Sequence, residues 1–132
     1  MKRVLFVCLG NACRSQMAEG FARAYGGGAW EVESAGLMPA VNLPPLTRQV
    51  MEEKGIDLEH QFPKPLEWVQ PETYDIVINI SGCDLPPELA DRERRWDVED
   101  PIGQPVKSYR KVRDQIDALV RSLLEEVRSG NG

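Results

Sequence analysis

Cysteine, histidine and aromatic residues are scarce in this sequence, which has three cysteines, one histidine and 7% aromatic residues. Three is an odd number and only Cys8 and Cys13 lie close together, so neither a disulfide framework nor a zinc site is expected. Long apolar runs are also missing, since no stretch approaches the roughly 18 residues that a membrane span needs. The apolar segment near the N-terminus is too short for a signal peptide, because Asn11 and Arg14 interrupt it. We therefore expect a cytoplasmic protein in which one or more thiols is reactive.

Positive charge is in short supply as well. Lysine and arginine number 16 against 21 aspartate and glutamate residues, which gives a formal net charge of −5. Neither nucleic acid nor a membrane is expected as a partner, because such a chain has no general electrostatic attraction for either. An anion must instead bind in a local pocket.

The 132 residues suit a single domain spanning 1–132, and 42% hydrophobic and 28% charged residues are typical of globular proteins.

Hydrophobic patterning predicts alternating strands and helices. The apolar run 3–8 suits a strand buried on both faces, and the apolar residues of 106–128 keep helical spacing. The other expected elements are helices over 14–25, from Pro44-Pro45 to Lys54-Gly55 and over 87–91, and strands over 30–33, 74–80 and 95–98. The alternation predicts a three-layer α/β fold, with a parallel sheet and helices on both faces. Ligands of such sheets bind beyond the carboxyl ends of the strands, where the loop at 8–15 lies.

The loop after the first predicted strand has the pattern of an anion-binding nest. Cys8 ends the strand and Arg14 and Ser15 open the next helix. Five residues lie between them, namely Leu9, Gly10, Asn11, Ala12 and Cys13. Backbone N–H groups of such a loop can surround a tetrahedral oxyanion, and the helix N-terminus adds its positive end. Gly10 and Asn11 are residue types that tolerate the left-handed backbone that a nest needs.

The side chains of the same loop indicate nucleophilic chemistry. The Arg14 guanidinium can bind two oxygens of an oxyanion in a bidentate fork. Together with the nest it would lower the pKa of Cys8 well below the free value of about 8.5, and Ser15 can donate a hydrogen bond to the sulfur. A thiolate beside a bound oxyanion is an activated nucleophile. The competing interpretation is a buried core cysteine followed by a solvated arginine, and the strand-to-helix context with Gly10 argues against it.

From Cys8 to Ser15 the sequence resembles the C-(x)5-R-S loop of the low-molecular-weight protein tyrosine phosphatase family. The continuation Gln16-Met17-Ala18-Glu19-Gly20 is more similar to the arsenate reductase branch of that fold, which is thioredoxin-coupled in many members. Other similar stretches are Glu33-Ser34-Ala35-Gly36, Val41-Asn42, Val50-Met51, Gly55-Ile56-Asp57, His60-Gln61 and Trp96 through Asp100-Pro101. The resemblance covers nearly the whole chain and implies a four-stranded parallel sheet flanked by helices.

The resemblance also implies roles for individual residues. Cys8 would attack phosphorus or arsenic in line, Arg14 would bind and stabilise the transferring group, and Asn11 would hold the shape of the loop. Asp100 matches the family's general acid, which protonates the leaving oxygen. From the residues alone, Asp-Pro at this position is simply a turn. Two other carboxylates stand close by in the sequence as alternatives, Asp97 and Glu99.

Two activities share this first step. The first interpretation is a phosphatase that hydrolyses aryl or tyrosine phosphate monoesters, of a small molecule or a protein, through a phosphocysteine at Cys8 with Asp100 as acid and base. The alternative is an arsenate reductase, in which a thiol attacks the adduct. Similar reductases carry two cysteines after the strand predicted at 74–80, whereas only Cys83 stands here. Cys83 or an external thiol of the thioredoxin or glutathione type would then resolve the adduct.

The missing second cysteine places the phosphatase first, and the reductase remains as the alternative. A third hypothesis is a sensor that binds phosphate or arsenate without catalysis. It has no use for a nucleophile at Cys8 or a proton donor at Asp100.

Cys13 also has two interpretations: a partner in a protective disulfide with the nucleophile, as in some phosphatases of this fold, or a small residue packed behind the loop.

Many reductase relatives bind potassium near the loop through an asparagine, a glutamate, a serine and an aspartate. Asn11, Glu19 and Ser34 match three of these, and Lys64 stands at the fourth position, where its ammonium would replace the cation. We therefore expect no metal ion and no other cofactor, with Glu19 and Ser34 supporting Asn11.

The slot over the loop is expected to be apolar without an aromatic wall. The residues that would line it are Leu37, Met38, Val41 and Ile102.

Structural roles are expected for the other conspicuous residues. We expect His60 at the surface or in loop packing, the charged run 92–95 on a solvated face, and Trp68 and Trp96 in packing positions.

Overall fold

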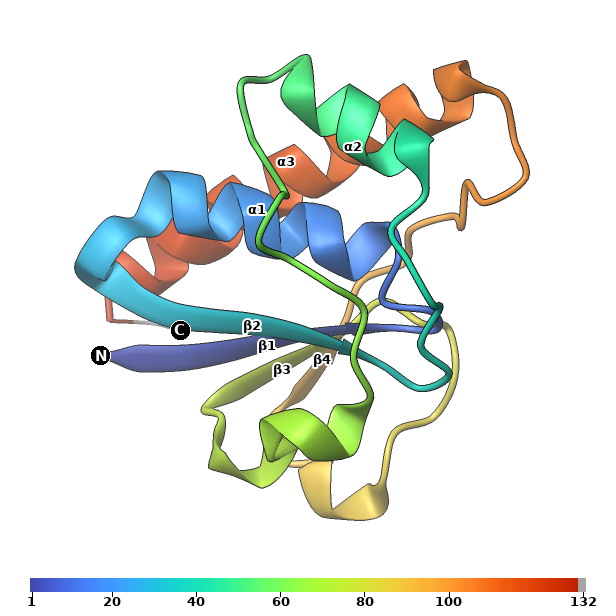
Figure 1. The fold of residues 1–132 in the computed structure, drawn as a ribbon. Coiled ribbons are helices and arrows are strands. Elements are labelled where there is room, and N and C mark those ends of the chain that lie inside the picture. The colour runs from blue at the N-terminus through green and yellow to red at the C-terminus, as the bar shows by residue number, and fades with distance from the viewer. Residues whose placement is uncertain (131–132) are drawn as a thin grey trace.

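The structure, a computed structural model, describes residues 1–130 and contains a parallel sheet of four strands in the order β2-β1-β3-β4 (Figure 1). The strands are β1 (Lys2–Cys8), β2 (Trp30–Gly36), β3 (Ile76–Asn79) and β4 (Glu93–Arg95). Cys8 pairs with Gly36 of β2, and Val7 pairs with Asn79 of β3. The carboxyl ends of the strands therefore meet at one edge of the sheet, at the loop that the sequence singled out.

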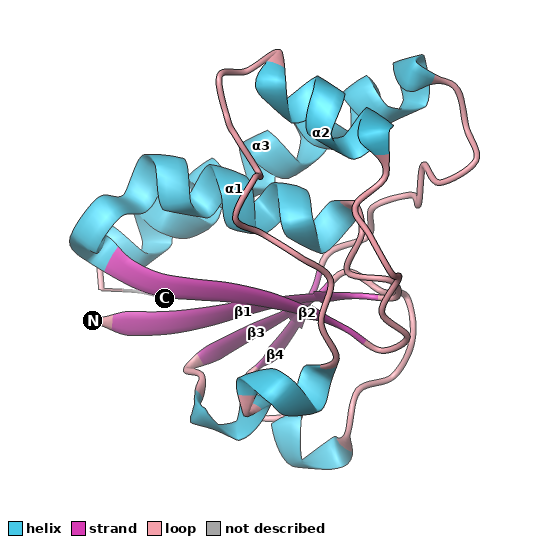
Figure 2. Cartoon of the chain, viewed as in Figure 1, coloured by secondary structure: helices cyan, strands magenta, loops and turns pink. Residues whose placement is uncertain are grey.

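Helices lie on both sides of the sheet, as predicted, but the two layers are unequal (Figure 2). One side carries the α-helices α1 (Arg14–Gly26), α2 (Pro45–Glu52) and α3 (Val106–Arg128). The other side carries short 3-10 helices, η2 (Leu66–Val69), η3 (Pro71–Thr73) and η4 (Pro87–Leu89), and η1 (Gly27–Ala29) joins α1 to β2. Within residues 1–130, no helix is both long enough and apolar enough to cross a bilayer.

The side chains of β1 divide between two cores with the period of two that a strand dictates. Val4, Phe6 and Cys8 belong to the core shared with α1 and α3. Leu5 and Val7 belong to the smaller core on the side of the short helices. Cys8 therefore leaves the strand on the α1 side, next to the first turn of that helix.

The boundaries predicted from the sequence agree best with the structure for the strongly periodic elements and least well at the sheet edge. The helix predicted over 106–128 is confirmed, and β2 extends beyond the predicted 30–33 because it pairs with β1 along its full length. The strand predicted over 95–98 is wrong, since β4 covers Glu93–Arg95. These three residues pair with β3 through the main chain, and Asn79 Nδ2 adds a side-chain hydrogen bond to Glu93 Oε2 at 2.9 Å. Charged side chains are typical of such an exposed edge, so apolar patterning does not reveal it.

The charged run 92–95 is partly tied down rather than simply solvated. Arg94 binds Glu126 of α3 at 2.7 Å, and Arg95 binds Asp84 and Glu93 at 2.9 Å each. These ion pairs connect the edge strand to the neighbouring helix and turn.

The two tryptophans behave differently from one another. Trp96 packs its ring 5.8 Å from that of Phe6, as expected of a packing residue. Trp68 is 68% exposed, so the expectation of a packing role is wrong there. The 3-10 helix η2 that carries it buries Leu66 instead. His60 is exposed, in agreement with the expectation.

Glu53 joins the end of α2 to α3 through two arginines. Its carboxylate lies 2.7 Å from Arg110 and 2.6 Å from Arg113. The hydrogen bond from Arg110, followed by that from Arg113, lowers the pKa of Glu53 from 4.5 to about 2. Because the folded pKa lies below the unfolded one, the ionised carboxylate stabilises the fold above pH 4.5, and this contribution is lost as the pH falls toward about 2.

We expect Glu53→Gln to lower the Tm at neutral pH and to have little effect near the folded pKa of about 2. Thermal unfolding followed by circular dichroism across this pH range measures the difference. Glu52→Gln, an adjacent exposed position, is the matched control and should leave the Tm unchanged. An equal loss of Tm by Glu53→Gln at both ends of the range would contradict the ion-pair account.

Candidate active site

The loop between β1 and α1 turns its carbonyl groups outward. The carbonyl oxygens of Cys8, Leu9 and Gly10 accept hydrogen bonds from the backbone of residues 37–40, at 2.8–3.1 Å. The next three carbonyls of the loop accept from Gln16 Nε2, Thr47 Oγ1 and Met17 N, respectively. In a trans peptide each N–H points away from the preceding carbonyl, and residues 1–130 contain no cis peptide. The N–H groups of residues 9–14 therefore face away from those outer partners, in the arrangement that binds an oxyanion.

Asn11 holds this loop in its strained conformation. Its φ is +48°, a left-handed value that is uncommon for residues other than glycine. The side chain is fully buried, and its Oδ1 accepts a hydrogen bond from the Lys64 backbone N–H at 3.0 Å. Its Nδ2 donates to Ser15 Oγ at 2.7 Å and to Ser34 Oγ at 2.9 Å. These bonds offset the backbone strain and fix which end of the amide faces Ser15.

The Cys8 sulfur lies 2.8 Å from Ser15 Oγ, and both residues are buried. Ser15 Oγ accepts a hydrogen bond from Asn11 Nδ2, so its own hydroxyl hydrogen is free to point at the sulfur. A hydroxyl that donates to sulfur stabilises the thiolate over the thiol. The sequence-based expectation of a Ser15 to Cys8 hydrogen bond thus agrees with the geometry, while the role of Cys8 as nucleophile stays a prediction.

Arg14 joins three segments that are far apart in the sequence. Its Nη1 donates to the carbonyl of Ile80, just after β3, at 2.7 Å and to that of Val98, after β4, at 3.0 Å. Its Nη2 lies 3.6 Å from Asp100 Oδ2. The guanidinium is 6% exposed and therefore fixed at the rim of the loop rather than solvated.

Asp100 lines the same cavity as Cys8 and Arg14. Its Oδ1 accepts a hydrogen bond from the Ile102 N–H at 3.1 Å, which orients the carboxyl within the Asp-Pro turn. Asp97, by contrast, lines a different cavity with the other side of Arg14. Of the three carboxylates considered from the sequence, Asp100 is thus the one that the cavity brings to Cys8 and Arg14.

The cavity over the loop has a volume of about 370 Å³ and a largely apolar wall. Its lining residues are Cys8, Leu9, Gly10, Ala12, Cys13, Arg14, Met38, Ala40, Pro44, Asp100 and Ile102. Met38 and Ile102 occupy the expected positions. Leu37 and Val41 do not line this cavity: Leu37 packs against the opposite core, and Val41 is 91% exposed.

The three cysteines occupy different environments and form no disulfide. Cys13 is 3% exposed, and burial raises its pKa to about 12, so it stays a thiol at neutral pH. Cys83 is exposed in the turn after β3, where Asn79 Nδ2 donates to its carbonyl at 2.7 Å. The cavity brings Cys13 next to Cys8, and Cys83 lies outside its lining.

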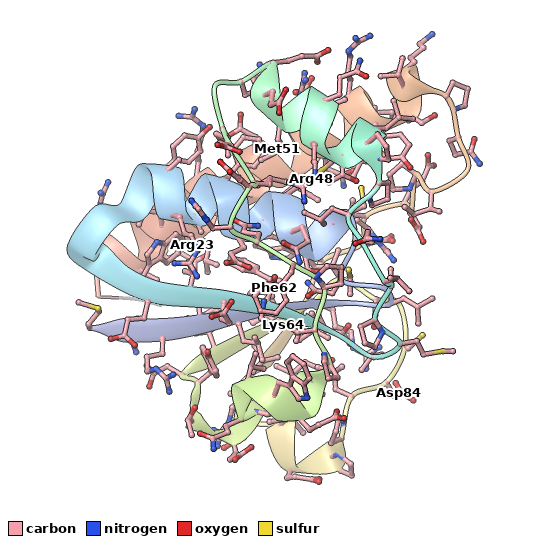
Figure 3. All side chains as sticks on the ribbon, viewed as in Figure 1. Arg23, Arg48, Met51, Phe62, Lys64 and Asp84 are labelled. Carbon is pink, nitrogen blue, oxygen red and sulfur yellow. The ribbon has the colours of Figure 1, made fainter. Side chains whose placement is uncertain are left out.

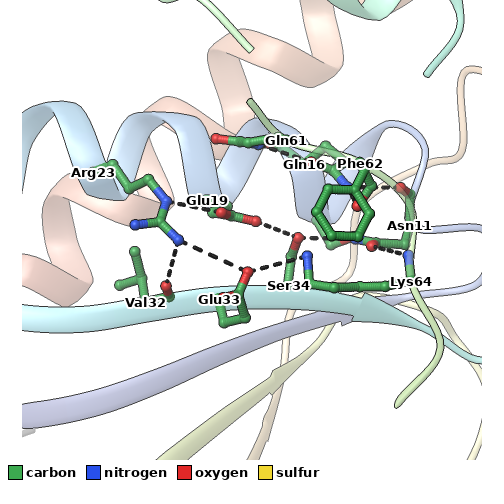
Figure 4. Close-up of polar contacts among 11 residues, drawn as sticks. Asn11, Gln16, Glu19, Arg23, Val32, Glu33, Ser34, Gln61, Phe62 and Lys64 are labelled. Atoms are coloured by element: carbon green, nitrogen blue, oxygen red, sulfur yellow. Dashed lines mark hydrogen bonds and ion pairs between the residues drawn. The ribbon is translucent and has the colours of Figure 1, made fainter. Parts of the chain in front are cut away.

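A cluster of charged side chains lies on the far side of Asn11 (Figure 4). Lys64 is buried, and Figure 3 shows it beside Phe62, where the chain after α2 crosses in front of β2. Its ammonium lies 3.0 Å from Glu33. Arg23 lies 2.8 Å from Glu19 and 3.8 Å from Glu33.

The cluster corrects one expectation. Lys64 was expected to stand in for a cation at Asn11, Glu19 and Ser34, but its ammonium binds Glu33 instead. With two cationic side chains already paired to the carboxylates, this donor set does not fit a potassium ion. The sequence analysis missed the roles of Arg23 and Glu33. Only the four-residue spacing of Glu19 and Arg23 on a predicted helix hinted at the first ion pair.

A family model described as low molecular weight phosphotyrosine protein phosphatase matches residues 3–85. The chain belongs to this family of enzymes, which confirms the resemblance found in the sequence.

The relatives cover nearly the whole chain. A glutaredoxin arsenate reductase of Synechocystis sp. is 43% identical in an alignment of 131 positions that covers 96% of this chain and 99% of the relative. The solved structure of an arsenate reductase in the phosphate binding state has a TM-score of 0.90 at 42% identity and covers 96% of this chain and 99% of its own. A low molecular weight protein tyrosine phosphatase from T. tengcongensis has a TM-score of 0.87 at 31% identity, with coverage of 96% and 99%. The four-stranded parallel fold is thereby confirmed.

Gly36 leaves the space that the loop occupies, and a substitution there tests the nest. A Cβ at Gly36 would lie 2.9 Å from the backbone N of Asn11 and 2.9 Å from the carbonyl O of Leu9, and backbone atoms cannot yield as a flexible side chain can. We expect Gly36→Ala to weaken the binding of inorganic phosphate about ten-fold or more, because small displacements of binding groups are costly.

Isothermal titration calorimetry measures this affinity. The control is Gly28→Ala, whose Cβ would meet nothing within 4 Å. Unchanged phosphate affinity in a folded Gly36→Ala variant would contradict the nest at residues 9–14.

Proposed function

We propose that the protein is an arsenate reductase that uses Cys8 as its nucleophile. The observation that carries the proposal is the Cys8 sulfur, hydrogen-bonded by Ser15 at 2.8 Å and placed in one cavity with Arg14 and Asp100. A relative named as an arsenate reductase is 43% identical along almost its whole length, against 31% for the phosphatase from T. tengcongensis. These similarities favour the reductase, which the sequence analysis had placed second, over the phosphatase.

In the first step the Cys8 thiolate attacks arsenic and forms the sulfur–arsenic bond. The opposite As–OH bond breaks, and its oxygen leaves as water after it takes a proton from Asp100. The N–H groups of residues 9–14 and the Arg14 guanidinium bind the three remaining oxygens, where negative charge accumulates. The oxidation state of arsenic does not change in this step, and the adduct still contains arsenic(V).

In the second step a thiol attacks the Cys8 sulfur. A disulfide forms, the sulfur–arsenic bond breaks, and its electron pair stays on arsenic, which leaves as arsenite. The attacking thiol is an external one, of the glutathione or glutaredoxin type, or Cys83. If an external thiol attacks, a second external thiol must then reduce the mixed disulfide left on Cys8. If Cys83 attacks instead, two external thiols reduce the Cys8–Cys83 disulfide. Each turnover therefore consumes two thiols and releases one disulfide.

We expect Cys8→Ser to abolish arsenite formation in the presence of arsenate, glutathione and glutaredoxin. Phosphate affinity should be retained, because the loop N–H groups and Arg14 remain. Chromatographic separation of arsenite from arsenate measures the first quantity and calorimetry the second. Arsenite formation by the folded Cys8→Ser variant would place the nucleophile elsewhere.

A matched substitution, Cys83→Ser, distinguishes the two resolving thiols. If the external thiol resolves the adduct, the variant turns over at the rate of the wild type. If Cys83 resolves it, mass spectrometry of the wild type after one equivalent of arsenate detects a Cys8–Cys83 disulfide, and the variant loses activity.

A second candidate function, hydrolysis of aryl phosphate monoesters, is favoured by the apolar wall of the cavity. Inorganic arsenate fills only part of a space of about 370 Å³. Met38, Pro44 and Ile102 offer an apolar surface that a small oxyanion does not use. An aryl group would lie against this surface, with its bridging oxygen directed at Asp100.

Asp100→Asn should slow the hydrolysis of phosphate esters with poor leaving groups by about 10²–10⁴-fold, because the leaving oxygen loses its proton donor. Esters with good leaving groups should be affected much less. Steady-state kinetics with a series of substituted phenyl phosphates measures the difference. A loss that is equal across the series, or negligible, would remove Asp100 from the role of general acid.

A further inference from the structure

A chain of hydrogen bonds leads from Cys8 through Ser15, Asn11 and Ser34 to Glu19. Figure 4 shows the part from Asn11 through Ser34 to Glu19. The last link is short, with Ser34 Oγ 2.5 Å from Glu19 Oε1. Every member is buried, so the direction of each bond is set by its neighbours rather than by water.

The carboxylate at the far end determines the direction of the chain. An ionised Glu19 has no proton to give, so Ser34 must donate its hydroxyl proton to it. Ser34 Oγ then serves as an acceptor for the hydrogen bond from Asn11 Nδ2. The same amide group donates to Ser15, which leaves the Ser15 proton for Cys8.

The orientation of the Asn11 amide is the point at which this direction could reverse. With Nδ2 toward the serines, Ser15 donates to the sulfur and favours the thiolate. With Oδ1 toward the serines, Ser15 would donate its hydroxyl hydrogen bond to Asn11. Toward Cys8 it could then act only as the acceptor of a hydrogen bond from the thiol. The Lys64 backbone N–H, a donor bonded to Oδ1, opposes that reversal from the other side.

Charged residues surround Glu19 and fix the position of its carboxylate. Arg23, on the same helix, lies 2.8 Å from its Oε2. Glu33 of β2 shares Arg23, at 3.8 Å, and is itself paired with Lys64 at 3.0 Å. The groups that line the adjoining cavity of about 700 Å³ also include Asp57 and His60.

The charged and titratable groups near Cys8 itself are separate from this cluster. They are Arg14, Cys13 and Asp100, which share its cavity.

We propose that Glu19 is a positioning residue whose carboxylate sets the direction of this hydrogen-bond chain, so that Ser15 donates its hydroxyl hydrogen to the Cys8 sulfur and makes that sulfur more reactive. The proposal deepens the proposed function, on which it rests only in taking Cys8 as the nucleophile. It goes beyond the expectation that Glu19 merely supports the loop, because it predicts a change in Cys8 reactivity without a change in fold.

The variant Glu19→Gln keeps the shape of the side chain and removes its charge. Arg23 can only donate, so the amide oxygen of the new side chain turns to Arg23 and its NH₂ group to Ser34. Ser34 Oγ then accepts a hydrogen bond from the amide of residue 19, so its own hydroxyl hydrogen turns toward Asn11. There it meets the Asn11 NH₂ group, which is also a donor. The chain reverses or breaks, and the thiolate loses the hydrogen bond from Ser15.

The rate of Cys8 alkylation by iodoacetamide, measured against pH in phosphate-free buffer, tests this directly. Peptide mapping separates Cys8 from Cys83, whose exposed thiol serves as an internal control. We expect the pH midpoint for Cys8 to rise by about one unit or more in Glu19→Gln, while the Cys83 profile stays the same. Glu31→Gln is the matched control, since Glu31 lies on β2 and pairs with Arg3, away from the hydrogen-bond chain.

An unchanged Cys8 midpoint in a folded Glu19→Gln variant overturns the proposal. If that variant does not fold, Arg23→Met replaces it, because this half-exposed arginine is the direct partner of Glu19. Loss of the guanidinium removes the partner that holds the Glu19 carboxylate beside Ser34, so the Cys8 midpoint should again rise, and an unchanged midpoint there overturns the proposal as well.

A double substitution separates the proposed path from a general loss of structure. In a Ser34→Ala background the link to Glu19 is cut, so adding Glu19→Gln should produce no further shift. A full additional shift would mean that Glu19 acts on Cys8 by another route and would contradict the proposal. Alkylation requires neither arsenate nor a reductant, so a shift in a protein that does not reduce arsenate would count against the proposed function alone.

Discussion

The hydrogen bond between Ser15 and the Cys8 sulfur is the interaction on which the rest of the site depends. It joins the last residue of β1 to the first turn of α1, so it forms only when the intervening loop wraps into a nest. That wrapping requires a left-handed residue at Asn11 and open space at Gly36. The geometry that places Ser15 at the sulfur is therefore the same geometry that turns the loop carbonyls outward and its N–H groups inward.

The parallel sheet explains why distant residues converge there. Its strands end at one edge, and Arg14 bonds the carbonyls that follow β3 and β4, at Ile80 and Val98. One buried guanidinium thus braces the edge and faces Asp100 across the cavity. Because Arg14 is held by protein carbonyls before any ligand arrives, the site is largely organised in advance, which lowers the cost of binding an oxyanion.

The sequence was informative where the pattern is local and uninformative where it depends on distant chain segments. The loop from Cys8 to Ser15 and the helix from Val106 to Arg128 follow from spacing and periodicity, and the structure agrees with both. Strand β4 was misplaced in the sequence analysis because it has only three residues, all of them charged, and so shows no apolar pattern. The ion pair between Lys64 and Glu33 was not predicted from the sequence, because it forms where the segment after α2 crosses β2. Local patterning carries no information on such a crossing.

The central claim is that Cys8, in its nest, passes electrons from an external thiol to arsenate. The most direct test compares the wild-type protein on two substrates under the same conditions, arsenate with glutathione and glutaredoxin, and p-nitrophenyl phosphate. The account predicts sustained arsenite formation with a kcat/KM well above that for hydrolysis of the ester. Brisk hydrolysis without arsenite formation would contradict it and would leave water, rather than a thiol, as the group that resolves the Cys8 adduct.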